Sequence, residues 1–320
     1  MAKLNLTGRL QSAISDLGPL GRTDEPLGPM TTYRVGGAAA IFVSPASMAD
    51  LREVAEVIAH YELPVLVVGR GSNLLVADAG FAGVAMSLAE WADGIEVTGS
   101  NVVAGSAVAL PVLARRTAAA GLTGFEWAVG VPGSVGGAVR MNAGGHGSDI
   151  AACLGRAEIF DLYNRSSGWR TADLLGLRFR GSSLADHEIV LTAELALSPG
   201  DMDQSEREIA EIVRWRRENQ PGGQNAGSVF VNPIPGQLSA GELIDRVGLR
   251  GFRVGGAFVS DKHANFIQAG DGATAADVKA VIDQVRERVA VETGFELRSE
   301  VRLVGFGEVD AAHPEGSSHG

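Results

Sequence analysis

Glycines are concentrated in one short segment of this chain, between residues 130 and 147. Seven of its eighteen residues are glycine, and Pro132, Ser134 and Asn142 stand among them. Glycine loses more conformational freedom on folding than any other residue, so such a cluster indicates backbone that bends sharply or approaches another molecule closely. We expect a bulky phosphorylated cofactor to lie against it.

A second small and polar segment follows an apolar, β-branched run at residues 65–68. It comprises Gly69, Arg70, Gly71, Ser72 and Asn73. Successive N–H groups at such a strand end form an anion-binding concavity. The segment is not a dinucleotide fingerprint, which needs a third glycine and an opening helix, whereas here Leu74 starts another apolar run. A plain strand–turn–strand connection is the alternative, but the nearby glycine cluster favours phosphate binding.

Polar side chains also gather around a turn-rich stretch at residues 220–228. Arg214, Arg216 and Arg217 precede it, and the planar guanidinium fork suits phosphate or carboxylate. The alternative is an ordinary solvated helix face. Asn225 and Ser228 lie in this stretch and Asn232 lies just after it, as uncharged hydrogen-bonding groups suited to orienting a ligand. The mixed segment 260–267 fits either a surface hairpin or a pocket wall, and its spacing does not decide between them.

Several other site types are disfavoured. His146 and His263 have no second histidine or carboxylate at ligand spacing, so we expect no metal site. Ser134 does not fit the Gly-x-Ser-x-Gly pattern of a nucleophile elbow, because Gly133 lies directly before it and Pro132 stands where the first glycine is needed. Cys153 is the only cysteine, which excludes an intramolecular disulfide and fits a small buried hydrophobe.

The bulk composition predicts a multidomain protein of ordinary globular type. The chain has 320 residues, of which 45% are hydrophobic and 20% charged. Its net charge of −11 argues against a broad nucleic-acid-binding face. The beginning of the chain lacks a charged segment followed by an apolar one, and no apolar run approaches the roughly twenty residues of a membrane span. We therefore expect a cytoplasmic protein without membrane or nucleic-acid partners.

The pattern along the chain predicts three domains and a tail. Residues 1–95 contain a β-α-β unit, with strands at 39–43 and 65–68 around a helix that follows the capping pattern of Ser47 and Asp50. Residues 96–200 are mixed α+β, with strands at 95–97, 102–104, 158–162 and 189–197 and a helix at 110–120.

The third predicted domain spans residues 201–307. We expect helices at 206–219, after Ser239 and at 274–292, and strands at 229–231, 257–259, 265–267 and 297–304. Residues 308–320 are expected to be a disordered tail.

From about residue 29 to residue 305 the chain closely resembles a known enzyme family. The resemblance rests on several ordered blocks, at residues 32–37, 67–76, 130–145, 226–230, 232–233, 255–266 and 300–302. Together these blocks are far more specific than any one of them. The family is UDP-N-acetylenolpyruvoylglucosamine reductase, the flavoenzyme that completes UDP-N-acetylmuramate for peptidoglycan.

The resemblance implies an α+β architecture. Two subdomains would form an FAD-binding fold of the vanillyl-alcohol-oxidase/p-cresol-methylhydroxylase type, and a C-terminal α+β domain would cover the substrate. It also implies non-covalent FAD, NADPH as hydride donor, UDP-N-acetylglucosamine enolpyruvate as substrate, and a monomer.

The resemblance further implies individual site residues. Ser228 would be the proton donor, with Arg180 and Glu300 as its catalytic companions. The expected FAD contacts are Arg34, Gly69, Arg70, Gly71, Ser72, Asn73, Leu74, Gly130, Pro132, Gly133, Ser134, Gly136, Gly137, Asn142 and Val190. The expected substrate contacts are Arg216, Gln220, Asn232, Lys262, His263, Asn265 and Arg302.

The chain departs from the family pattern at three places. Phe179 stands where a tyrosine is common, Val231 stands where a lysine is frequent, and the stretch from Arg180 to Ser228 is too short for a tyrosine-bearing insertion. We place the chain in the branch without that loop. Two alternatives are a flavin oxidase or dehydrogenase acting on a sugar or hydroxy acid, and a non-catalytic nucleotide-sugar-binding protein. The presence of Arg180, Ser228 and Glu300 argues against the second.

Overall fold

The computed structural model describes residues 5–307, which form two compact units. Unit 1 contains the described residues up to Glu25, together with Ala39–Gly71 and Ala82–Gln220. Unit 2 contains Pro26–Ala38, Ser72–Phe81 and the described residues from Pro221 onward. Because the polypeptide passes repeatedly between the units, residues that are distant in the sequence meet inside each of them.

The first sheet of unit 1 packs against two helices. Its spatial order is β1 (Gly21–Pro26), β2 (Ala38–Val43), β5 (Phe81–Met86) and β3 (Val65–Val67), and the helices are α1 (Leu6–Leu17) and α2 (Met48–Tyr61). Ser47 caps α2 by accepting a hydrogen bond from the Asp50 N–H (3.1 Å). The Asp50 carboxylate accepts from the Ala46 N–H (3.0 Å), so the capping pattern is only half of a capping box.

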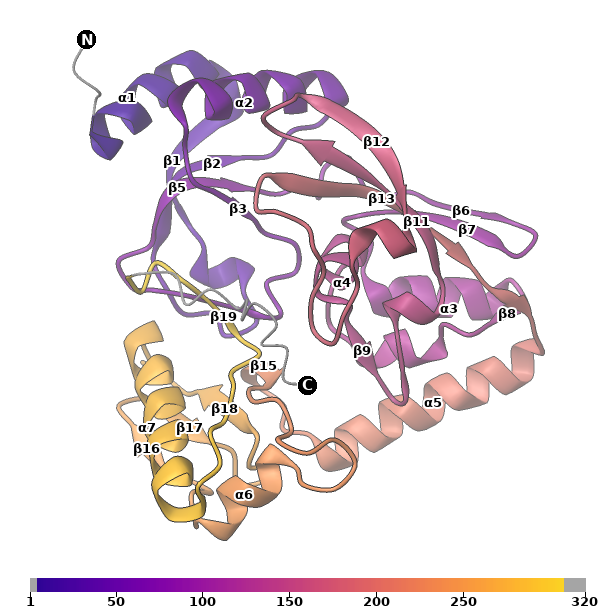
Figure 1. Ribbon diagram of the computed structural model, residues 1–320, viewed down its shortest axis with the longest axis vertical. Helices are drawn as coiled ribbons and strands as arrows, with labels where there is room; N and C mark the ends of the chain where they lie inside the picture. Colours follow the sequence, from indigo (N-terminus) through magenta and orange to yellow (C-terminus); the bar gives the residue numbers. More distant parts are fainter. Residues whose placement is uncertain (1–4, 308–320) are drawn as a thin grey trace, which may run out of the picture. The chain divides into compact units, whose positions relative to one another are not determined.

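The second sheet of unit 1 is antiparallel, and its central strand is buried on both faces. Its order is β12 (Ser166–Thr171), β11 (Leu154–Asp161), β13 (Glu188–Ala196), β7 (Asn101–Gly105) and β6 (Ile95–Thr98). Ile189 and Leu191 join the core beneath α1 and α2, whereas Val190 faces a second core, as strand alternation requires. Helices α3 (Leu110–Ala119) and α5 (Met202–Asn219) contribute to that second core (Figure 1).

The glycine cluster contains a short helix that the sequence analysis did not predict. This helix is α4 (Val135–Met141). It lies between η3 (Glu126–Gly130) and the paired strands β9 (Gly144–Gly145) and β10 (Ser148–Asp149). Ser134 accepts a hydrogen bond from the Gly137 N–H (3.4 Å) at its start. Glycine disfavours helix, but here the Gly136 N–H also donates to the Ser106 carbonyl (2.9 Å). Tertiary contacts therefore override local propensity.

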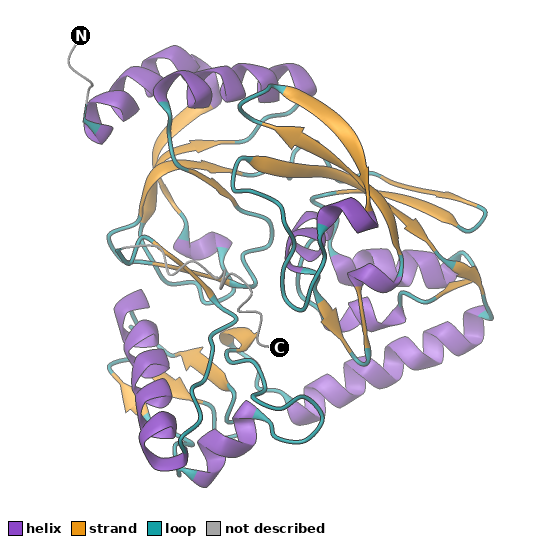
Figure 2. Cartoon of the chain, viewed as in Figure 1, coloured by secondary structure: helices purple, strands orange, loops and turns teal. Residues whose placement is uncertain are grey.

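Unit 2 is a four-stranded antiparallel sheet with helices packed on it (Figure 2). The strand order is β15 (Gln224–Ser228), β18 (Phe266–Ala269), β17 (Ala257–Val259) and β16 (Arg253–Val254), and the helices are α6 (Ala240–Arg246) and α7 (Ala275–Thr293). A reciprocal capping box of Thr274 and Asp277 opens α7. A separate parallel pair joins β4 (Leu74–Val76) to β19 (Arg302–Val304).

The remaining elements are short. They are β8 (Leu122–Thr123) paired with β14 (Ser198–Pro199), and the 3₁₀ turns η1 (Gly18–Leu20), η2 (Gly28–Met30), η4 (Ile150–Ala152) and η5 (Ala172–Leu175). Within residues 5–307 no helix is both long enough and apolar enough to cross a membrane.

Two strand predictions in unit 2 were wrong. The predicted strand at 229–231 is displaced to Gln224–Ser228. Val229 still bonds to the Asn265 main chain, but Phe230 bonds to the Asn265 side chain and Val231 to the Arg298 carbonyl, so no regular ladder continues. The predicted strand at 297–304 is shortened to Arg302–Val304. The predicted tail 308–320 lies outside the described residues, and the predicted domain boundaries at 95 and 200 stay predictions.

Candidate functional site

Main-chain hydrogen bonds in unit 2 bring Ser228 and Glu300 onto neighbouring segments. Ser228 is the last residue of β15 and pairs with Phe266 of β18. The next residue, Val229, accepts a hydrogen bond from the Glu300 N–H (2.7 Å). Both Ser228 and Glu300 are partly exposed, so their side chains are accessible. The structure therefore places Ser228 and Glu300 on main-chain segments that are hydrogen-bonded to each other.

Asn73 connects the predicted cofactor loop to the same region of unit 2. Its side-chain amide donates to the Glu300 carbonyl (2.9 Å), and its own carbonyl accepts from the Arg302 N–H (3.0 Å). The loop then continues into β4, which pairs with β19. The predicted FAD residues Asn73 and Leu74 thus lie beside the predicted catalytic Glu300 and the predicted substrate contact Arg302.

The predicted phosphate-binding glycines of unit 1 form a cradle that side chains would fill. A Cβ atom on Gly69 would lie 2.5 Å from the Ser134 Oγ, and one on Gly136 would lie 2.8 Å from the Ser106 Cβ. Ser134 is itself buried. The strand-end loop and the start of α4 are therefore in direct contact. The Gly136 and Gly137 N–H groups are bonded to the Ser106 carbonyl and to Ser134 Oγ, so the phosphate site stays a prediction.

A tight turn in unit 1 holds the predicted catalytic residue Arg180. The main chains of Arg178 and Gly181 exchange hydrogen bonds of 2.9 and 3.0 Å, so Phe179 and Arg180 occupy the two central positions. Arg180 has a φ of 57°, a left-handed conformation that non-glycine residues seldom adopt. Its Nη1 donates to the Gly144 carbonyl (3.2 Å), and its guanidinium lies 5.1 Å from the centre of the Phe179 ring. Local strain of this kind is concentrated at functional sites.

Asn142, a predicted FAD contact, anchors the Arg180 turn. It ends α4 with a φ of 40° and is buried. Its Nδ2 donates to the Asp149 carboxylate (3.1 Å) and to the Arg178 carbonyl (3.3 Å), while its Oδ1 accepts from the Ala151 N–H (3.0 Å). The side chain thus joins the end of the glycine cluster to the turn that presents Arg180.

Two predicted substrate contacts, Arg216 and Gln220, are paired at the end of α5. Nε of Arg216 donates to Gln220 Oε1 (2.8 Å), and Nη1 donates to the Gly130 carbonyl at the start of the glycine cluster. A guanidinium has five N–H donors, and these two bonds use two of them. Burial, followed by the Arg216 charge, lowers the pKa of the nearby His146. The predicted substrate residues of unit 1 therefore lie against its predicted cofactor segment.

The predicted substrate contacts of unit 2 also have defined local roles. Asn232 Oδ1 accepts from the Ala240 N–H (3.1 Å) at the start of α6, and the Lys262 N–H donates to Ser260 Oγ (3.2 Å). His263 Nδ1 accepts from the Asn265 N–H (3.2 Å), and burial lowers the pKa of its imidazole. Asn265 is almost fully buried and bonds to Phe230.

The last two predicted FAD contacts differ in exposure. Arg34 is exposed, with a φ of 57°, whereas Val190 is 6% exposed and belongs to a core. Sequence reasoning missed two residues: Thr32 Oγ1 and Trp127 Nε1 are buried and have no hydrogen-bond partner within the described part of the chain. Such groups are rare, so they are candidates for ligand contacts. The available signal was their place in the sequence, since Thr32 lies two residues before Arg34 and Trp127 lies three residues before Gly130.

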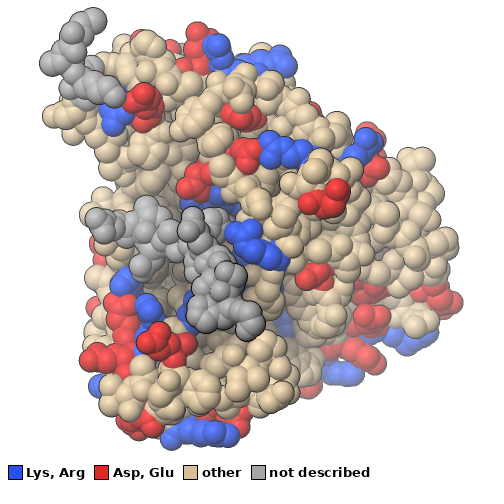
Figure 3. All heavy atoms as spheres, in the orientation of Figure 1, with Lys and Arg blue, Asp and Glu red and all other residues tan. Residues whose placement is uncertain are grey.

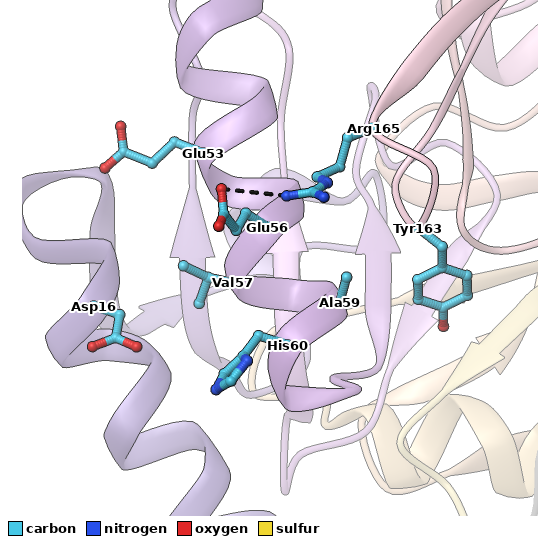
Figure 4. A pocket seen from close by; sticks show the side chains of 8 residues that line it. All are labelled: Asp16, Glu53, Glu56, Val57, Ala59, His60, Tyr163 and Arg165. Carbon is cyan, nitrogen blue, oxygen red and sulfur yellow. Dashed lines mark ion pairs between the residues drawn. The ribbon is translucent and has the colours of Figure 1, made fainter.

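A concave surface in unit 1 does not contain any of the predicted site residues. Its cavity volume is about 520 Å³, and Glu56 forms an ion pair with Arg165 at its edge (3.4 Å; Figure 4). The lining side chains come from α1, from α2 and from the turn after β11: Asp16, Glu53, Glu56, Val57, Ala59, His60, Tyr163 and Arg165. We therefore do not assign the reaction to it.

Charge is distributed in mixed fashion over the visible face. Acidic side chains lie among basic ones there (Figure 3). In the described chain no group of three or more His, Cys, Asp or Glu residues is arranged to hold a metal ion.

The close packing at Gly69 predicts that a side chain there lowers both the stability of the protein and its flavin content. Gly69→Ala should displace the Ser134 hydroxyl from the start of α4, cost about 1 to 3 kcal/mol of stability as overpacking does, and reduce bound flavin. Adding Ser134→Ala should restore part of the loss, because the new Cβ would then meet the Ser134 Cβ at an ordinary 3.6 Å. Flavin absorbance per protein and thermal unfolding measure both effects.

The matched control for Gly69→Ala is Gly168→Ala. Nothing lies within 4 Å of a Cβ built on that exposed strand residue. It should bind flavin as the wild type does. A Gly69→Ala protein with full flavin content, or a double variant no better than the single one, would contradict the cradle.

Comparison with known proteins gives consistent matches along the chain. Residues 39–161 match an FAD binding domain, and residues 219–304 match the C-terminal domain of UDP-N-acetylenolpyruvoylglucosamine reductase. The chain is 43% identical over 297 residues to the UDP-N-acetylenolpyruvoylglucosamine reductase of Heliobacterium modesticaldum, covering 92% of this chain and 94% of the relative. It is 37% identical to that of Bacillus subtilis, covering 88% and 93%.

A solved structure extends these similarities to three dimensions. The crystal structure of UDP-N-acetylenolpyruvylglucosamine reductase from Thermus caldophilus matches with a TM-score of 0.77 and 34% identity, covering 89% of this chain and 99% of that one. The matches confirm the predicted α+β FAD-binding fold and FAD as the cofactor.

Proposed function

This chain belongs to the UDP-N-acetylenolpyruvoylglucosamine reductase family, and we propose that it reduces UDP-N-acetylglucosamine enolpyruvate to UDP-N-acetylmuramate with NADPH in peptidoglycan precursor synthesis. The observation that carries this proposal is the placement of Ser228 and Glu300 on hydrogen-bonded neighbouring segments. A flavoprotein that only oxidises a sugar or hydroxy acid has no need of such a proton donor. The monomeric state and the cytoplasmic location stay predictions.

The glycine segments supply the cofactor site. When bound, FAD supplies hydride transfer from NADPH to the vinyl carbon remote from the substrate carboxylate. We assign its phosphates to the cradle of Gly69, Ser134 and Gly136, where the strand-end loop packs directly on the start of α4. Arg34, Arg70 and Ser72 belong to the same proposed set, as do the other small residues of the two glycine segments.

Ser228 completes the reduction by protonating the substrate. Addition of hydride leaves an electron pair on the α carbon, which spreads into the carboxylate as an enolate. The Ser228 hydroxyl donates its proton to that carbon, forming the new C–H bond. Positioned general acids contribute about 10² to 10⁴-fold. A serine hydroxyl is a weak acid, so it suits only a strongly basic partner such as this one.

Arg180 and Glu300 support the charge and the proton. A fixed guanidinium stabilises the carboxylate as negative charge develops, and the left-handed turn holds Arg180 in one conformation. Glu300 is held by its N–H bond to Val229, next to the proton donor. Arg216, Gln220, Asn232, Lys262, His263 and Arg302 are the proposed contacts to the rest of the nucleotide sugar.

Anaerobic mixing tests the proposed function. NADPH should bleach the bound flavin, and UDP-N-acetylglucosamine enolpyruvate should then restore its colour with formation of UDP-N-acetylmuramate. Absorbance in a stopped-flow instrument follows both half-reactions. Rapid return of colour with oxygen but not with this substrate would instead indicate a flavin oxidase. A protein purified without flavin, and unable to take it up, would indicate the non-catalytic alternative.

A further inference from the structure

The buried side chain of Asn265 holds the segment that follows Ser228. Its Oδ1 accepts a hydrogen bond from the Phe230 N–H (2.9 Å), and its Nδ2 donates to the Phe230 carbonyl (2.8 Å). The main-chain carbonyl of Asn265 also accepts from the Val229 N–H (2.8 Å). Asn265 is only 4% exposed. One residue therefore makes three hydrogen bonds to the two residues after the proposed proton donor.

The paired bonds to Phe230 replace the strand ladder at the point where it stops. β15 ends at Ser228, yet Val229 and Phe230 are 0% and 1% exposed. Buried N–H and carbonyl groups left without partners destabilise the folded state. An asparagine amide has a donor and an acceptor in the same plane as a peptide group, so it satisfies both groups of Phe230 at once. Neither aspartate nor leucine of similar size can do so.

The opposite edge of the same segment holds Glu300. Val229 accepts from the Glu300 N–H, and the Val231 N–H donates to the Arg298 carbonyl (2.9 Å). Phe230 and Ser299 form an isolated β-bridge between these bonds. A shift of Phe230 would therefore displace Ser228 and Glu300 relative to each other.

We propose that Asn265 is a positioning residue that sets the location of the Ser228 hydroxyl for protonation of the substrate. This inference rests on the proposed function. It differs from the substrate contact that the family resemblance implied for Asn265, because the amide acts through Phe230 and Val229. Misplacement by about 1 Å can cost about 10²-fold in rate, so a small shift of this segment has a large effect.

Asn265→Asp is the sharpest test because it changes one NH₂ group into an oxygen. Its second oxygen would oppose the Phe230 carbonyl. We expect flavin content and NADPH-driven reduction to stay within about twofold of the wild type, and substrate Kd within about threefold. Reoxidation at saturating substrate should be slower by about 10- to 100-fold. The lactyl product should become a mixture at its new stereocentre, because water then protonates the carbon from either side.

A second variant and a control complete the experiment. Asn265→Leu, which loses both bonds to Phe230, should show the same pattern if it binds flavin. Asn5→Asp is the matched control. Asn5 is exposed and caps α1 through its Oδ1, and aspartate caps a helix equally well, so both half-reactions should keep their wild-type rates. Thermal unfolding and flavin content verify that each protein is folded.

Three results would overturn the inference. Weaker substrate binding with normal reoxidation at saturation would make Asn265 a substrate contact. Loss of both half-reactions in proportion to flavin content, with a stereochemically pure product, would make it a general structural residue. If the substrate fails to reoxidise even the wild type, the proposed function falls and the inference falls with it.

Discussion

In Ser228→Ala, NADPH should still bleach the flavin at the wild-type rate, while reoxidation by the enolpyruvyl substrate should slow by about 10² to 10⁴-fold. The change removes only one hydroxyl. The main-chain pairing of Ser228 with Phe266 and the bond from Glu300 to Val229 do not involve the side chain. Rapid mixing in separate half-reactions measures the difference.

Two further variants make the Ser228 result specific. Ser228→Cys keeps a proton on the side chain and should recover part of the reoxidation rate. Ser166→Ala, on the exposed strand β12, should behave as the wild type in both half-reactions. Equal loss of both half-reactions in Ser228→Ala would refute a proton-donor role, because protonation belongs to the second half-reaction alone.

The periodic elements were predictable because their burial pattern is local. Helix α2 and strands β7 and β13 match their expected positions, since apolar spacing decides which face is buried. Helix α5 ends where expected but begins four residues before the predicted start at residue 206. The strand expected at 229–231 fails for the opposite reason. Its apolar residues are buried as a strand's would be, but their hydrogen bonds go to the main chain and the side chain of Asn265 and to the segment 298–300, which no local pattern encodes.

The candidate site depended on contacts between distant segments. The Asn73 amide bonds to the Glu300 carbonyl across the parallel pair of β4 and β19, and nothing in either segment alone predicts that pairing. Ser228 was noted in the sequence as a hydrogen-bonding group, but the catalytic roles of Ser228 and Glu300 were predicted only through the family resemblance. The structure adds the physical reason for their association, which is the bond between Glu300 and Val229. Left-handed backbone at Arg180 was likewise unpredictable, because arginine is not a residue typical of that conformation.

Substitutions at Arg180 should separate the contribution of the side chain from that of the left-handed backbone. Arg180→Ala and Arg180→Gly both remove the guanidinium, so each should slow reoxidation by about 10² to 10³-fold, the effect of losing one preorganised donor. Their stabilities should differ. A left-handed conformation costs an L-residue roughly 1 to 2 kcal/mol but costs glycine little, so the glycine variant should unfold at the higher temperature.

Arg180→Lys gives the intermediate case. Lysine keeps the positive charge but lacks the planar fork, so reoxidation should lie between the wild type and Arg180→Ala. Flavin reduction by NADPH serves as the internal control for all three proteins. An Arg180→Gly protein as active as the wild type would show that the turn, and not the guanidinium, matters. Equal stability of the glycine and alanine variants would show that the φ of 57° stores no strain.

The stability of Arg180→Gly and its reoxidation rate together show whether the strained backbone at position 180 serves the function. The turn is tied to Asn142 through the Arg178 carbonyl and to Gly144 through the Arg180 side chain, so its surroundings enforce the conformation. If glycine at position 180 raises stability while reoxidation collapses, the chain retains an unfavourable residue solely for its guanidinium. That combination is what a catalytic arginine held in a strained turn requires.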